Sequence, residues 1–132
     1  MALHDGPSRG QAHQLVLRFS AVVELATGLL LVIAPAIVIE SLIGPTAPSA
    51  TVVGRVLGGG LLALGVTGVG ASAHPDWGVR IAYVLYNFAT ATILVSAGLG
   101  GEAGGAFLWP VAIVHAALGT ALLVTSRRND QG

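Results

Sequence analysis

Residues 18–35 read RFSAVVELATGLLLVIAP, an apolar run with a carboxylate, that of Glu24, inside it. The apolar character extends from Leu15 to Ile39. About 20 apolar residues cross the hydrocarbon core of a bilayer, and this run is too long for the apolar core of a secretory signal peptide. An ionisable group inside a membrane span must face a partner, a cavity or water. We therefore expect a transmembrane helix whose Glu24 faces the interior of a helix bundle.

The composition places the whole chain in the same class. Its 132 residues are 54% hydrophobic and 9% charged, whereas a soluble domain has roughly 25% charged residues. The six basic residues are all arginines and balance six acids, so nothing resembles the basic face that binds nucleic acid. The chain has no cysteine, which excludes disulfides, thiolate metal sites and cysteine nucleophiles.

Four apolar stretches, separated by turns rich in glycine and proline, account for most of the chain. The sequence predicts an all-α fold, a four-transmembrane-helix bundle. The predicted segments are a disordered N-terminal tail at 1–13, a transmembrane domain at 14–126 with spans at about 15–39, 49–72, 79–99 and 108–126, and a C-terminal tail at 127–132. The glycine-rich turn at 100–105 is expected to act only as a linker.

The second span is rich in glycine at spacings that let two helix backbones approach closely. The small-residue pairs are Gly54 and Gly58, Gly59 and Ala63, and Gly68 and Ser72. We expect these faces to pack against another helix, either within the chain or in a second subunit.

Arginine positions predict the orientation of the spans. The N-terminal side, the second turn and the C-terminal tail hold Arg9, Arg18, Arg80, Arg127 and Arg128, whereas the first and third turns have no basic residue. Basic residues favour the cytoplasmic side, so both termini are expected to be cytoplasmic. An even number of spans agrees with this, and we expect a multi-pass protein of the bacterial cytoplasmic membrane.

The polar side chains inside the spans predict an interior column. At 1.5 Å per helical residue, Glu24 and Asn87 lie at one depth, and Arg55 and His115 lie about 10 Å away from it. The candidate ligand-binding residues are Glu24, Arg55, Tyr83, Tyr86, Asn87 and His115. Glu24 and His115 are the candidate catalytic residues, since both can exchange protons. Arg55 has an alternative, in which its long side chain reaches the surface and meets Glu40.

These residues also have purely structural interpretations. Glu24 can fix helix packing, and His115 can be a hydrogen-bonded group within the bundle. A haem ligand is one further alternative for His115. No metal site and no cofactor are predicted, because zinc needs three or four protein ligands. No phosphate-binding glycine loop or nucleophile elbow is present in the sequence.

The two halves of the chain share a weak internal similarity. ELATGLLLV, from Glu24 to Val32, aligns with NFATATILV, from Asn87 to Val95. Both halves begin on the same side, so a repeat would have its axis along the membrane normal. A chance match is the alternative, because helices made of Ala, Leu, Val and Gly often align.

Residues 15–126 resemble the small four-span bacterial membrane proteins grouped loosely with the DoxX family. The resemblance depends on an arginine and a polar residue in the first span, the glycine-rich second span, Tyr86-Asn87 in the third, and Trp109-Pro110 followed by His115 in the fourth. The first span lacks the glycine-aromatic opening of DoxX proper, so no site residue is carried over. The resemblance implies a four-helix bundle that supports a redox or assembly partner.

Three functions remain open, and the sequence does not decide whether the protein is an enzyme. The first is a non-catalytic accessory bundle that forms a homo-oligomer or joins a larger membrane complex through its glycine-rich faces. The second is a small membrane enzyme or carrier for a lipophilic, isoprenoid- or quinone-like molecule held by the polar column. The third is a proton or small-ion path, which requires a continuous wet column.

Overall fold

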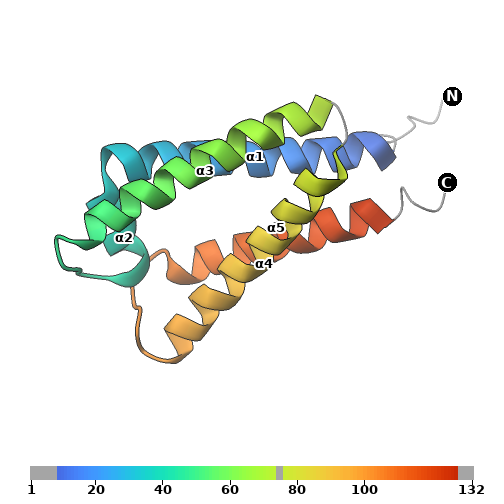
Figure 1. Cartoon of the computed structure of the whole chain (residues 1–132). Coiled ribbons are helices and arrows are strands. Elements are labelled where there is room, and N and C mark those ends of the chain that lie inside the picture. The colour runs from blue at the N-terminus through green and yellow to red at the C-terminus, as the bar shows by residue number, and fades with distance from the viewer. Residues whose placement is uncertain (1–8, 74–75, 128–132) are drawn as a thin grey trace, which may run out of the picture.

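The computed structural model describes residues 9–73 and 76–127, and every regular element among them is a helix. The helices are α1 (Arg9–Ile33), α2 (Pro35–Ile43), α3 (Ala50–Ala73), α4 (Trp77–Leu99) and α5 (Leu108–Arg127) (Figure 1). α1, α3, α4 and α5 are the four that are long and apolar enough to cross a membrane. The predicted all-α fold with four membrane-length helices is confirmed.

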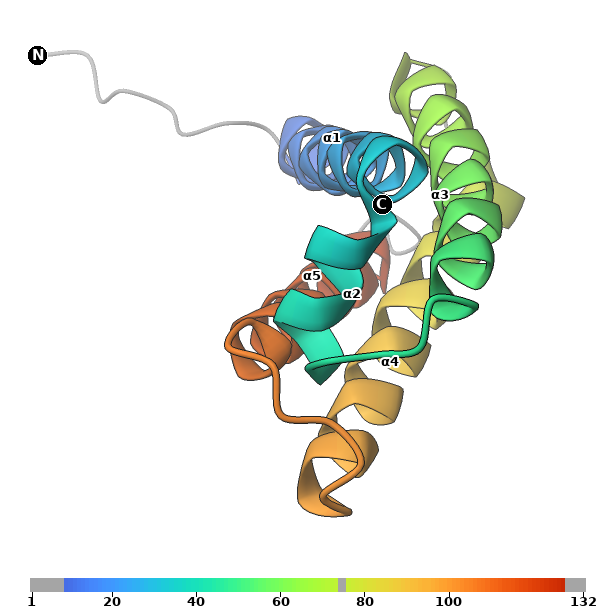
Figure 2. The same ribbon diagram turned by 90° about the vertical axis from the view of Figure 1, so that its left-hand side faces the viewer.

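The first predicted span, 15–39, is wrong as a single helix. α1 ends at Ile33, Ala34 has non-helical dihedral angles (φ −133°, ψ 59°), and Pro35 begins α2. Proline disfavours the helical conformation of the residue before it and has no N–H for the helix ladder. The chain therefore turns at Ala34, and α2 crosses the end of the bundle in front of α5 (Figure 2).

The predicted N-terminal tail is also partly wrong, because α1 begins at Arg9 and residues 9–13 are helical. His13 is buried, and its Nδ1 is hydrogen-bonded to Thr125 Oγ1 on α5 at 2.9 Å. This tertiary contact explains why the helix extends beyond the apolar run. Residues 1–8 and 128–132 of the two predicted tails lie outside the described part of the chain.

α1 packs most extensively against α3, and glycine makes this close approach feasible. A Cβ atom added to Gly28 would lie 2.8 Å from Gly58 O, and one added to Gly58 would lie 2.7 Å from Gly28 O. The two backbones are therefore in direct contact, as small residues allow in membrane helix pairs. The spacing from Gly54 to Gly58 serves packing within the chain, since Gly54 lies against Ile39 of α2.

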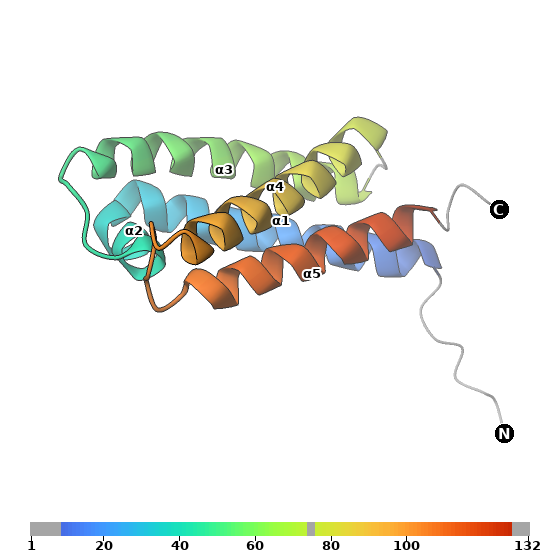
Figure 3. The ribbon, with the colours of Figure 1, turned by 90° about the horizontal axis from the view of Figure 1, so that it is seen from below.

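α4 and α5 form the second helix pair, and α4 inclines away from α3 along its length (Figures 1 and 3). The two pairs meet where α1 contacts α5 and where the Tyr83 hydroxyl donates to Leu64 O of α3 at 2.8 Å. That hydroxyl lies against Gly68, where a Cβ atom would overlap it. Each half of the chain thus supplies one long-helix pair. The internal duplication itself stays a prediction.

The turn at 100–105 is more than the predicted linker. The backbone N–H groups of Gly104, Gly105 and Phe107 donate to Ile43 O, Leu42 O and Ser41 O at 3.3, 3.1 and 2.9 Å. These carbonyls belong to the last turn of α2, where a helix provides no partner of its own. The segment therefore attaches α2 to the start of α5.

Candidate ligand-binding site

Glu24 lies inside the bundle, as its position in an apolar helix predicted. Its side chain is 1% exposed, and the Tyr86 hydroxyl of α4 donates to its Oε2 at 3.0 Å. The other carboxyl oxygen, Oε1, is buried and has no hydrogen-bond partner among the described residues. The carboxyl group is thus held between α1 and α4 by Tyr86.

Asn87 is the centre of a second group of hydrogen bonds. It is 0% exposed, and its Nδ2 donates to Tyr83 O at 2.8 Å and, at 3.5 Å, to Ser20 Oγ of α1. Its Oδ1 lies 2.9 Å from Nδ1 of His115 on α5. Asn87 therefore joins α1, α4 and α5 at one point.

Tyr86 connects the two groups. Its ring meets the ring of His115 edge to face, with 5.6 Å between the centroids and an interplanar angle of 82°. The structure thus brings together Glu24, Tyr83, Tyr86, Asn87 and His115. Their role in ligand binding or catalysis stays a prediction.

Arg55 lies apart from this cluster. Of its two predicted places, the polar column is wrong and the surface is right, although its partner there is a backbone carbonyl and not Glu40. Its side chain is exposed, and its Nε donates to Val32 O at 3.3 Å. Val32 is in the last turn of α1, where carbonyl groups lack helical partners and the helix dipole favours a cation. A long side chain can satisfy this end from the surface, so Arg55 does not need to enter the bundle.

The predicted 10 Å separation in depth between Asn87 and His115 is also wrong, because the two side chains are hydrogen-bonded. Counting residues from the span ends treats the helices as perpendicular to the membrane. α4 is inclined to its neighbours (Figure 3), so equal counts do not correspond to equal heights.

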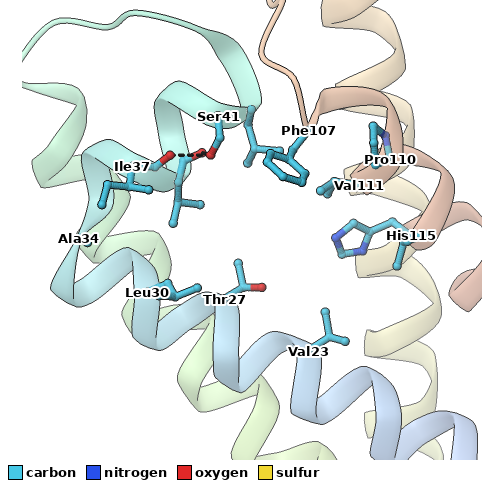
Figure 4. Close-up of a pocket in the computed structure, with 13 residues that line it drawn as sticks. Val23, Thr27, Leu30, Ala34, Ile37, Ser41, Phe107, Pro110, Val111 and His115 are labelled. Atoms are coloured by element: carbon cyan, nitrogen blue, oxygen red, sulfur yellow. Dashed lines mark hydrogen bonds between the residues drawn. The ribbon is translucent and has the colours of Figure 1, made fainter.

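A cavity of about 490 Å³ lies beside this cluster, between α1, α2 and the start of α5 (Figure 4). Most of its wall is aliphatic, and its three polar lining residues are Thr27, Ser41 and His115. The full lining is Val23, Thr27, Leu30, Ala34, Ile37, Val38, Ser41, Leu42, Phe107, Pro110, Val111, Val114 and His115. Composition of this kind is typical of small-molecule sites, which combine apolar walls with a few polar groups.

Two of the polar groups are available to a ligand. Figure 4 shows the His115 ring projecting from α5 into the cavity and the Thr27 hydroxyl turned into the same space. The Nδ1 atom of His115 is engaged by Asn87, which leaves Nε2 without a hydrogen bond among the described residues. Ser41 differs, because its hydroxyl donates to Ile37 O and Val38 O of its own helix.

Ser20 and Thr27 were not among the residues predicted from the sequence. Ser20 precedes Glu24 by four residues, and Thr27 follows it by three, so both lie on the helix face that carries the carboxylate. This spacing was a usable signal. Among the described residues, no group of three or more His, Cys, Asp or Glu side chains is placed to hold a metal ion.

No family model matches the chain, and neither a curated protein nor a solved structure matches it. The resemblance to the DoxX family therefore stays a prediction, and a function can be proposed only from the geometry of the site.

Proposed function

We propose that the protein is a small multi-pass protein of the bacterial cytoplasmic membrane that binds a lipophilic molecule in the cavity between α1, α2 and α5. The apolar body of the ligand lies along the aliphatic wall, and its polar head meets His115. The observation that carries this proposal is a histidine ring with one unengaged nitrogen on the wall of a cavity of about 490 Å³. That volume falls within the range of known ligand sites.

The cavity favours binding over the other two interpretations. Its aliphatic lining does not resemble the continuous wet column of an ion path. Several glycines expected to recruit a partner, including Gly54 and Gly58, are occupied within the chain. Self-association is a second candidate, favoured by Gly59 and Gly60, where an added Cβ would meet open space.

The position of Glu24 favours a supporting role for this residue over a catalytic one. Glu24 is not among the residues that line the cavity, and it approaches His115 only through Tyr86. A general acid must come within hydrogen-bond reach of the reacting group. The carboxyl group instead supports the wall behind the site.

Binding of radiolabelled farnesol to the protein purified in detergent tests the proposal. Val114 lines the cavity, whereas the adjacent Ile113 is 66% exposed and does not line it. We expect Val114→Trp to fill part of the cavity and weaken farnesol binding by about tenfold or more. The matched control, Ile113→Trp, should bind as the wild type does. Equal binding by both variants, or no saturable binding by the wild type, would overturn the proposal.

A further inference from the structure

We infer that the cavity selects a ligand whose head group is an uncharged hydroxyl, because Asn87 fixes His115 in the tautomer that presents only an acceptor to the cavity. This inference rests on the proposed function and names the chemical class of its ligand. The class comprises long-chain alcohols, phenols and the reduced, quinol form of quinone-like molecules.

The orientation of the Asn87 amide is set by its contact with Tyr83. One end of the amide lies 2.8 Å from Tyr83 O, which is a carbonyl oxygen and can only accept. That end must be the NH₂ group. The amide oxygen therefore faces His115.

The tautomer of His115 follows from the orientation of this amide. Its Nδ1 lies 2.9 Å from Asn87 Oδ1, an atom that carries no hydrogen. Nδ1 must therefore carry the proton and donate it. In a neutral imidazole the other nitrogen, Nε2, is then an acceptor with a free lone pair.

The charge of the His115 ring is determined by its surroundings. His115 is buried, and its hydrogen-bond partner among the described residues is the neutral amide of Asn87. A charged group without a counter-ion is costly in a membrane interior. Glu24 does not provide one by direct contact, because no hydrogen bond or ion pair joins it to His115 among the described residues. We therefore infer that the His115 imidazole is neutral.

A hydroxyl head group matches the polar groups on the cavity wall. Nε2 accepts a hydrogen bond from a hydroxyl group, and the hydroxyl oxygen can in turn accept one from Thr27, which also lines the cavity. An ether or a quinone carbonyl offers only lone pairs and would face the lone pair of Nε2. The cavity lining contains no arginine or lysine, so a carboxylate or phosphate head group would lack a counter-charge.

The test compares the binding of farnesol and of farnesyl methyl ether, in which a methyl group replaces the hydroxyl hydrogen, to the full chain in detergent. We expect the wild type to bind farnesol at least about tenfold more tightly than the ether. In Asn87→Leu the ring is free to carry its proton on Nε2, so the preference should fall towards one. Thr92→Leu, an exposed position on the same helix, is the control that should keep the preference.

A second measurement does not depend on the folding of a variant. Nitrogen-15 NMR of the histidine side chains should show a neutral ring protonated at Nδ1, assigned by its loss in His115→Gln. A ring protonated at Nε2, or equal binding of the two probes by the wild type, would overturn the inference while the proposed function stands. Failure of both probes to bind would overturn the proposed function itself.

Discussion

Tyr86 connects the two groups of hydrogen bonds in the polar interior. Its hydroxyl donates to Glu24, and its ring meets the edge of His115. In a membrane interior no water replaces a lost hydrogen bond. Removal of one partner therefore exposes the other to the full cost of burial.

Removal of the Tyr86 hydroxyl tests this dependence. Tyr86→Phe leaves both carboxyl oxygens of Glu24 without a donor, and we expect the free energy of unfolding to fall by about 1–3 kcal/mol. Glu24→Leu should cost a similar amount, because it removes the acceptor of the Tyr86 hydroxyl. The double variant should lose less than the sum of the two single losses. Unfolding in mixed micelles of increasing denaturing-detergent content, followed by circular dichroism, measures all three.

The exposed Thr92 on the same helix is the control for this cycle, since Thr92→Val should leave the unfolding transition unchanged. Strictly additive losses would contradict a direct Glu24–Tyr86 interaction.

Residue chemistry made part of the site predictable. Glu24, Tyr86, Asn87 and His115 are polar groups within apolar helices, and the cost of exposing them to lipid required an inward orientation. For Thr27 the one signal was its spacing from Glu24, because a hydroxyl in a helix commonly bonds to its own backbone and does not by itself require an inward orientation. The hydrogen-bond partner of Arg55 could not be predicted either, since it depends on where the end of α1 lies.

At the level of elements, α2 gives the cavity one of its walls. It is too short to cross a membrane, at nine residues, and it is held by the contact of Ile39 with Gly54 and by the backbone bonds from the 100–107 segment. The cavity therefore depends on glycines that do not line it.

Gly105 and Gly104 form a matched pair for testing the attachment of α2. A Cβ atom on Gly105 would overlap Ser41 O and the Leu42 carbonyl, whereas one on Gly104 would meet open space. We expect Gly105→Ala to lower the free energy of unfolding by about 1–3 kcal/mol and to weaken farnesol binding. Gly104→Ala should change neither quantity. Hydrogen exchange at Phe107, whose N–H donates to Ser41 O, should be faster in Gly105→Ala only. Unchanged exchange there would refute this attachment.

The break between α1 and α2 could be read from the sequence, but the attachment could not. Pro35 lies inside an apolar run longer than a membrane requires, and proline ends a helix for a local steric reason. The 100–105 segment has little side-chain pattern, and its hydrogen bonds depend on backbone groups brought near by the rest of the fold. Local sequence rules therefore predict the helix break at Pro35 but not the attachment of the 100–105 segment to α2.

For the whole molecule, the two ends of the bundle differ in character. Arg9, Arg18, Arg80 and Arg127 lie towards the end where α1 begins and α5 finishes, whereas Arg55 is the one described arginine near the other end, where α2 lies (Figure 1). Basic residues favour the cytoplasmic side. We therefore expect the α2 end to face outward.

Cysteine labelling can test this orientation without background, because the chain has no cysteine of its own. A membrane-impermeant maleimide should label Glu102→Cys in intact spheroplasts. It should label Trp77→Cys, at a position that is 71% exposed, only after permeabilisation. The reverse pattern would show the opposite topology.

The contacts between the two helix pairs differ in kind from those within the first pair, and this difference bears on assembly. Apolar helix surfaces can slide past one another in lipid at little cost, since acyl chains are as apolar as leucine. Directional bonds such as Tyr83 to Leu64 and Tyr86 to Glu24 cannot be kept after such a slide. These bonds therefore favour one alignment of the α1–α3 pair against the α4–α5 pair over alignments displaced by a helical turn.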